Sequence, residues 1–162
     1  MFDKFGEFDS YEEINRAAKA QLEEGDLEAI KTIAEENGLD PEDAEDFCTG
    51  AIEELTTPIL AAIGKLELEA KDLKLEGTLK DWTDCIKQSC MENEEMALAV
   101  RRKGKSLKDC MAIILKKAFG EKTQLDDRIT KAAGLRPPLY ISIPRKAQIK
   151  EIVREYYLGE KK

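Results

Sequence analysis

Apolar residues recur at every third or fourth position along most of this chain, which is the spacing of amphipathic helices. Capping residues such as Ser10, Asp26 and Thr57, together with stopping glycines, divide the pattern into segments. These signals predict helices over residues 11–24, 27–36, 41–55, 58–76, 79–92, 94–103, 107–119, 123–133 and 144–158. Only the run 139–143, which follows two prolines, favours an extended chain. We therefore expect a mainly α fold, a multi-helix bundle with at most one short strand or hairpin near residues 138–143.

The densest positive charge falls on the turn between the predicted helices 94–103 and 107–119. Asn93 and Ser106 are suitable N-cap residues for these helices, and Gly104 can take the left-handed conformation that ends the first one. The cations of this basic turn are Arg101, Arg102, Lys103, Lys105 and Lys108. They can stabilise a helix C-terminus through its dipole, or they can contact the phosphates of RNA or DNA. The second helix lacks the base-reading side chains of a helix-turn-helix protein, so we expect contact only with the sugar-phosphate backbone of RNA or DNA.

Carboxylates dominate one face of the predicted helix 41–55. Their helical spacing places four of them together as an acidic ridge, which consists of Glu42, Glu45, Asp46 and Glu53. The ridge is either a solvated face that keeps the protein soluble, or a strip that imitates nucleic-acid phosphates and occupies a basic groove on a partner. The alternating acids and central glycine of a calcium loop are absent from the sequence, so we do not expect a cation site there.

The net charge of -8 hides a division along the chain. Residues 1–76 carry 7 Lys+Arg against 22 Asp+Glu, whereas residues 77–162 carry 19 against 12. We therefore divide the chain into an acidic helical N-terminal region, residues 1–76, and a basic helical region, residues 77–162. In the predicted helix 58–76, Leu60, Leu68 and Leu75 lie outside the main apolar seam. That helix is expected either between the two regions or, in a homodimer, against a second copy.

The chain lacks the residue sets that most enzymes use. It contains no histidine, no CxxC pair and neither of the common glycine-rich phosphate-binding motifs. We expect no catalytic residues, no cofactor and no metal site, and we expect Cys85 and Cys110 to be reduced core side chains. No apolar run is long enough to span a bilayer, and the residues after Met1 are charged rather than typical of a signal peptide. These features predict a cytoplasmic binding protein without enzymatic activity.

A longer pattern runs through residues 81–118 and the last predicted helix. It consists of Trp82, Ile86, Asn93, Met96, Ala97, the run Lys105-Ser106-Leu107-Lys108-Asp109-Cys110, and Ile149, Ile152, Val153, Tyr156 and Tyr157. In these positions the chain resembles the PcfK-like family of mobile genetic elements. The resemblance implies a small, mostly helical accessory protein of conjugative elements or phages, and some family members resemble anti-CRISPR inhibitors of type II RNA-guided nucleases. The acidic N-terminal region lies outside the resemblance.

On this basis we expect the chain to bind such a nuclease, or its guide-RNA complex, in the cytoplasm of a bacterial host and to block DNA binding or cleavage. The acidic ridge is the candidate contact with the nuclease, and the basic turn is the candidate contact with the guide RNA or DNA backbone. The alternative is a nucleic-acid-binding accessory protein of a conjugative element. We expect no association with membranes in either case.

Overall fold

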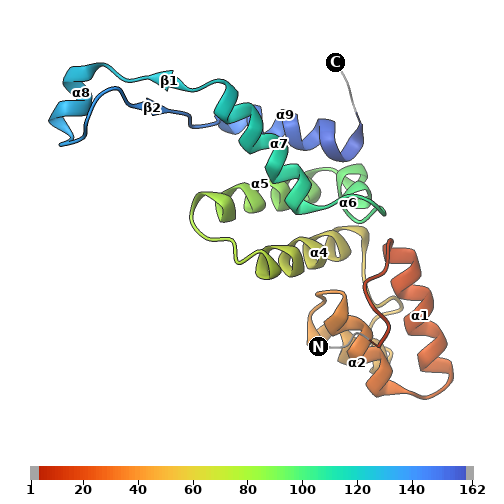
Figure 1. Cartoon of the computed structure of the whole chain (residues 1–162). Helices are drawn as coiled ribbons and strands as arrows, with labels where there is room; N and C mark the ends of the chain where they lie inside the picture. Colours follow the sequence, from red (N-terminus) through yellow and green to blue (C-terminus); the bar gives the residue numbers. More distant parts are fainter. Residues whose placement is uncertain (1–3, 160–162) are drawn as a thin grey trace.

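The computed structural model describes residues 4–159 and is mainly α-helical, as the sequence predicts (Figure 1). The helices are α1 (Tyr11–Glu23), α2 (Leu27–Glu36), α3 (Pro41–Thr49), α4 (Pro58–Asp72), α5 (Thr78–Glu92), α6 (Glu94–Val100), α7 (Leu107–Gly120), α8 (Asp127–Ala132) and α9 (Lys146–Leu158). Two short strands, β1 (Thr123–Gln124) and β2 (Tyr140–Ile141), form an antiparallel pair. Among the described helices, none is long and apolar enough to cross a membrane.

Most helices begin where the capping pattern predicts. The Ser10 hydroxyl accepts a hydrogen bond from the backbone N–H of Glu13 at 3.1 Å, and the Ser106 hydroxyl accepts one from Asp109 at the same distance. These bonds satisfy backbone donors that would otherwise have no partner in the first helical turn. Helix α5 begins one residue earlier than the predicted residue 79, because Gly77 is its N-cap and Thr78 is already the first helical residue.

Three helices end at least three residues earlier than predicted, and one of them, α4, stops at Asp72 instead of residue 76. Helix α3 stops at Thr49 instead of near residue 55, because Gly50 takes a left-handed conformation with φ of 82° and turns the chain. Residues 51–55 that follow are irregular. Helix α6 stops at Val100 instead of residue 103, so Arg101, Arg102 and Lys103 lie after the helix rather than in its last turn.

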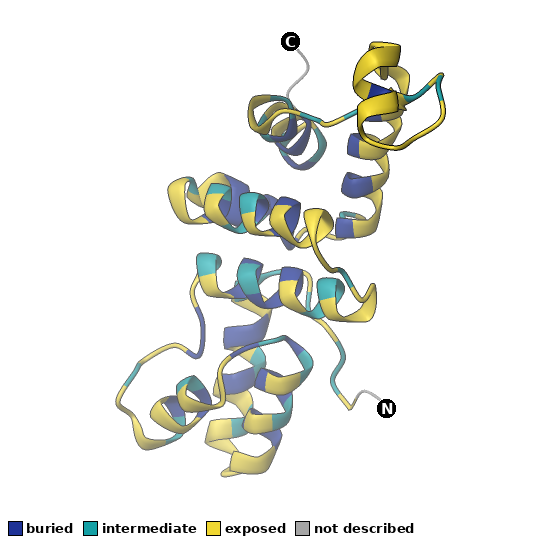
Figure 2. Ribbon diagram, turned by 90° about the vertical axis from the view of Figure 1, so that its left-hand side faces the viewer, coloured by how far each residue is buried: buried dark blue, intermediate teal, exposed yellow. Residues whose placement is uncertain are grey.

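Two clusters of buried apolar side chains meet at α4. The N-terminal cluster is built mainly by α1, α2 and α3, and the C-terminal cluster by α5, α6, α7 and α9. Helix α4 contributes Ala61 to the first and Ala62 and Leu66 to the second. This confirms that α4 lies between the two parts, and Figure 2 shows the buried positions of each part turned toward its own interior. The division in packing therefore falls within α4, whereas the division in charge falls near residue 76.

The segment 121–145 projects from the body, and we call it the arm (Figure 1). Thr123 pairs with Ile141 and Gln124 pairs with Tyr140, and α8 lies at the far end. The predicted strand at 139–143 is therefore present, although it is only two residues long. The predicted helix 123–133 begins only at residue 127, because its first residues form β1 instead.

Candidate interaction surfaces

Arg101 does not belong to an exposed basic surface. Its side chain is buried, with 2% of its surface exposed, and it reaches across to the N-terminal part of the molecule. The guanidinium donates hydrogen bonds to the carbonyl oxygen of Phe8 at 2.9 Å and of Ala61 at 2.7 Å, and it also contacts the carbonyl and side-chain oxygens of Asn37. Burial lowers its pKa, while the nearby acids Glu7 and Asp9 oppose that change. Arg101 is a structural residue, and the prediction that it contacts phosphate is wrong.

Lys105 is also engaged within the molecule. Its ammonium group donates to the carbonyl oxygen of Tyr156 at 2.7 Å and lies 4.7 Å from the centre of the Tyr156 ring. Only Arg102, Lys103 and Lys108 of the basic turn are exposed to solvent. The turn therefore presents three cations to a partner instead of the five that the sequence predicts.

A second buried cation holds the turn from the opposite side. The ammonium group of Lys65 on α4 donates to the carbonyl oxygens of Val100 at 2.8 Å and Lys105 at 2.7 Å. Glu69, one turn later on α4, accepts from the backbone N–H of Leu107 at 3.3 Å. Burial lowers the pKa of Lys65 and raises that of Glu69, and the charge of each opposes the change in the other. Sequence reasoning missed this pair, although Lys65 interrupts an apolar run and was a detectable signal.

The predicted acidic ridge is correct in part. Glu42, Glu45 and Asp46 are exposed on α3, whose opposite side buries Ala44 and Phe47 in the N-terminal cluster. Glu53 is exposed as well, but it follows Gly50 in the irregular segment and so does not continue the helical face. The ion pairs of residues 4–159 involve none of the four carboxylates. The acidic surface is consequently formed by a helix and the loop after it.

A surface that sequence reasoning missed lies on α7 and the arm. Eight large apolar side chains are exposed there, namely Ile113, Leu115, Phe119, Ile129, Leu135, Tyr140, Ile141 and Ile143. The same stretch is basic, because residues 113–146 contain eight Lys+Arg against three Asp+Glu. Exposed apolar groups gathered in one region are a common feature of interaction sites.

Part of this surface is a regular strip along the outer side of α7. Lys108, Ala112, Leu115 and Phe119 recur at i, i+4, i+7 and i+11, which places them on one helix face, and all four are exposed. Lys122 extends the strip, since its ammonium group lies 5.0 Å from the ring centre of Phe119 and 5.3 Å from that of Tyr140. We call this set, with Tyr140, the α7 strip. In the sequence, the α7 strip corresponds to a second apolar stripe that is offset from the buried stripe of the same helix.

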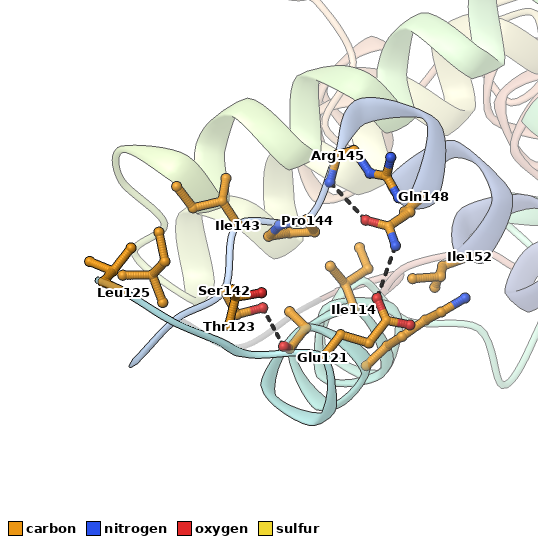
Figure 3. Close-up of a pocket in the computed structure, with 13 residues that line it drawn as sticks. Ile114, Glu121, Thr123, Leu125, Ser142, Ile143, Pro144, Arg145, Gln148 and Ile152 are labelled. Atoms are coloured by element: carbon orange, nitrogen blue, oxygen red, sulfur yellow. Dashed lines mark hydrogen bonds between the residues drawn. The ribbon is translucent and has the colours of Figure 1, made fainter. Parts of the chain in front are cut away.

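A cleft opens beside the base of the arm (Figure 3). Its volume is about 460 Å³, and its walls come from the end of α7, the paired strands and the start of α9. Gln148 spans one side, because its amide donates to Glu121 at 3.0 Å and accepts from the backbone N–H of Arg145 at 3.0 Å. The Ser142 hydroxyl donates to the carbonyl oxygen of Ala118. These bonds fix the arm to the body at the point where it leaves α7.

The cysteines of the chain are free thiols. Cys90 and Cys110 are buried, and burial raises the pKa of each thiol to about 12. Since the thiolate is the reactive form, both are poor nucleophiles at neutral pH. Within the described part of the chain, no group of three or more cysteine, aspartate and glutamate side chains is arranged to hold a metal ion.

Comparison with known proteins adds no relative to this description. No family model, no curated protein and no solved structure matches the chain.

Proposed function

We propose that this chain is an anti-CRISPR-type inhibitor that binds a type II RNA-guided DNA nuclease of the bacterial host, or its guide-RNA complex. In this proposal the bound inhibitor blocks DNA binding or cleavage and carries out no chemistry of its own. The resemblance to the PcfK-like family suggests the kind of partner. The observation that supports the proposal is the acidic surface formed by α3 and the segment after it.

Exposed carboxylates on a firmly packed helix suit this role. A groove that holds DNA or RNA is lined by lysine and arginine, so it attracts any surface that carries fixed negative charge. Glu42, Glu45 and Asp46 are carried by a helix whose other side is buried against α2, so the charges need little ordering when they bind. Exposed charges of this kind contribute little to stability, which leaves them free to serve a partner.

The direct test is a DNA-cleavage assay with a purified type II nuclease and its guide RNA. We expect the wild-type protein to inhibit cleavage, and we expect the variant Glu42→Gln, Glu45→Gln, Asp46→Asn, Glu53→Gln to inhibit at least about tenfold less, equivalent to about 1.4 kcal/mol of binding free energy. A control variant removes four exposed charges elsewhere, through Glu76→Gln, Asp81→Asn, Glu151→Gln and Glu155→Gln.

The outcomes separate the parts of the proposal. A wild-type protein that neither binds nor inhibits the nuclease would end the proposal. Equal inhibition by the acidic-surface variant and the wild type would keep the inhibitor but remove the phosphate-imitating surface from its mechanism. Equally weakened inhibition by both variants would indicate that total charge, rather than the surface on α3, attracts the nuclease.

A nucleic-acid-binding accessory protein of a conjugative element is the second candidate. The observation that favours it is the presence of three exposed cations, Arg102, Lys103 and Lys108, in one turn of the basic region. This function predicts binding to labelled DNA or RNA without any nuclease. Changing the three cations to alanine should make the slope of log affinity against log salt shallower, by about 0.7 to 0.9 for each phosphate that is no longer neutralised. An unchanged slope would remove the turn from nucleic-acid binding.

A further inference from the structure

The α7 strip is an apolar helix face that no other part of the described chain covers. Leu115 is 58% exposed and Phe119 is 70% exposed, while the neighbouring face of the same helix buries Ile114 and Ala118. Apolar anchors one or two turns apart on a helix are the usual means by which a helix docks on another protein. The strip therefore has the form of a docking face.

The charges around the strip define what can cover it. The exposed charges of α7 are Lys108, Lys116 and Lys117 against one carboxylate, Asp109, and Lys122 lies beside Phe119. Two strips facing each other across a two-fold axis would bring these cations together, and like charges at close range oppose association. The matching surface must instead combine apolar groups with carboxylates.

Such a surface exists at the turn between α1 and α2. Leu22 is 37% exposed and Leu27 is 45% exposed. The carboxylates that surround these leucines are Glu23, Glu24, Asp26 and Glu28, and all four are exposed. Asp26 caps α2 through the backbone N–H of Ala29 at 3.0 Å, and Glu28 lies 3.6 Å from Lys31. We call the two leucines and four carboxylates the acidic corner.

The α7 strip and the acidic corner of the same molecule cannot contact each other. The acidic corner lies at the end of the molecule formed by α1 and α2, and the outer end of α7 lies at the other end, where the arm begins, in both views (Figures 1 and 2). Each surface can be covered only by another molecule. The apolar groups and the opposite charges of the two surfaces match one another.

We propose that the α7 strip of one molecule docks on the acidic corner of a second copy of this chain. The contact is head-to-tail, so every dimer keeps one free strip and one free corner. A contact of this kind continues into longer chains unless its rotation closes a ring. The proposal is independent of the nuclease, because the acidic surface on α3 consists of other residues.

Sedimentation velocity of the full-length protein tests the contact. The average mass should rise as the protein concentration increases from about 5 to about 200 µM, the range in which contacts of micromolar affinity form. It should fall when salt is raised from about 50 to about 500 mM, because salt screens the opposite charges. A strip variant, Leu115→Gln with Phe119→Gln, and a corner variant, Leu22→Gln with Leu27→Gln, should each stay monomeric.

Mixing the two variants provides the decisive measurement. The strip variant still has an intact corner and the corner variant still has an intact strip, so an equal mixture should form a one-to-one dimer that does not grow further. Such a dimer also proves that both variants are folded. The control Met91→Gln changes an apolar side chain that is 58% exposed on α5, and it should assemble like the wild type.

Several results would overturn the proposal. One is a wild-type protein that stays monomeric over the whole range, and another is a dimer that persists in the corner variant. The proposal would also be overturned if an equal mixture of the two folded variants formed no dimer. If the monomeric wild type instead binds a labelled single-stranded oligonucleotide, and the strip variant does not, the strip is a nucleic-acid site and the self-association is rejected.

Discussion

Gly38 and Gly64 meet backbone to backbone where the turn between α2 and α3 crosses α4. A Cβ atom on Gly38 would lie 2.3 Å from the carbonyl oxygen of Gly64, and a Cβ atom on Gly64 would lie 2.6 Å from the carbonyl oxygen of Asn37. Both distances are too short for a side chain of any kind. This contact sets how closely the N-terminal helices approach α4, and it lies beside the Asn37 oxygens to which Arg101 binds.

Replacing Gly64 by alanine should destabilise the protein. The methyl group meets backbone atoms, which cannot rotate away, so we expect a loss of about 1–3 kcal/mol in the free energy of unfolding. Urea denaturation followed by circular dichroism measures it. Gly120→Ala is the matched control, because Gly120 is also helical and has no atom near its Cβ position. That change should be neutral or stabilising, and a neutral Gly64→Ala would contradict the close contact.

Arg101→Met should be far more damaging than Arg102→Met. The methionine keeps most of the aliphatic volume but leaves the carbonyl oxygens of Phe8 and Asn37 without their donor. The carbonyl oxygen of Ala61 loses the guanidinium but keeps its bond within α4. Each buried acceptor left unpaired costs about 1–3 kcal/mol, so the total loss in stability should be at least about 2 kcal/mol. Arg102 is exposed, and its replacement should change stability by less than about 0.5 kcal/mol. Similar effects for both variants in urea denaturation would refute the structural role of Arg101.

Tyr156→Phe should weaken the start of α7. The Tyr156 hydroxyl accepts a hydrogen bond from the backbone N–H of Ser106 at 2.8 Å, and its removal leaves that donor without a partner in a half-buried position. We expect a loss of about 1 kcal/mol in the free energy of unfolding. Tyr140→Phe removes the hydroxyl of a ring that is 49% exposed on the arm, so it serves as the control and should have almost no effect. Thermal and urea denaturation of both variants measure this difference in the free energy of unfolding.

Alkaline pH should destabilise the protein through its buried thiols. The pKa of Cys90 and of Cys110 is raised from 9.0 to about 12 in the folded protein, chiefly by burial. Below pH 9 both states keep these protons, so the contribution is fully present. Above pH 9 the unfolded chain releases them while the folded protein does not, and each thiol then removes about 1.4 kcal/mol of stability per pH unit.

The measurement is the change in the free energy of unfolding between pH 8 and pH 10.5, for the wild type and for the variant Cys90→Ala with Cys110→Ala. The wild type should lose about 2 kcal/mol more per thiol than the variant over this range. Comparing the two proteins matters, because burial lowers the pKa of Lys65 and its titration shifts stability in the opposite direction. The variant starts from a lower stability but should lose less of it on going to high pH. Parallel curves for the two proteins would show that the thiols ionise freely in the folded state.

Local signals in the sequence predict the helices well, because caps act over three or four residues. Ser10, Asp26 and Ser106 each bond to a backbone N–H three residues away, and nothing distant is needed to recognise them. The end of α3 is harder to predict because the pattern of acids continues past Gly50, whereas the helix does not. Strand β1 is hidden for a different reason, since Thr123 pairs with Ile141, which is far along the chain.

The candidate site is less predictable than the fold. Arg101, Arg102 and Lys103 look equivalent in the sequence, and only the approach of Asn37 and Ala61 selects Arg101 for burial. The pattern of charges cannot distinguish a cation that binds carbonyl groups within the protein from one that is available to a partner. The α7 strip is easily overlooked because the buried stripe of the same helix already explains an ordinary amphipathic pattern.

The position of Arg101 late in the chain has a consequence for synthesis. Ribosomes synthesise a protein from its N-terminus, so the N-terminal parts emerge first and usually fold first. Here the carbonyl oxygens of residues 8, 37 and 61 cannot bond to the guanidinium of Arg101 until that later residue has been synthesised. A chain interrupted before residue 101 should therefore not persist as a small folded acidic protein. Cellular proteases should remove it, so that only complete copies accumulate.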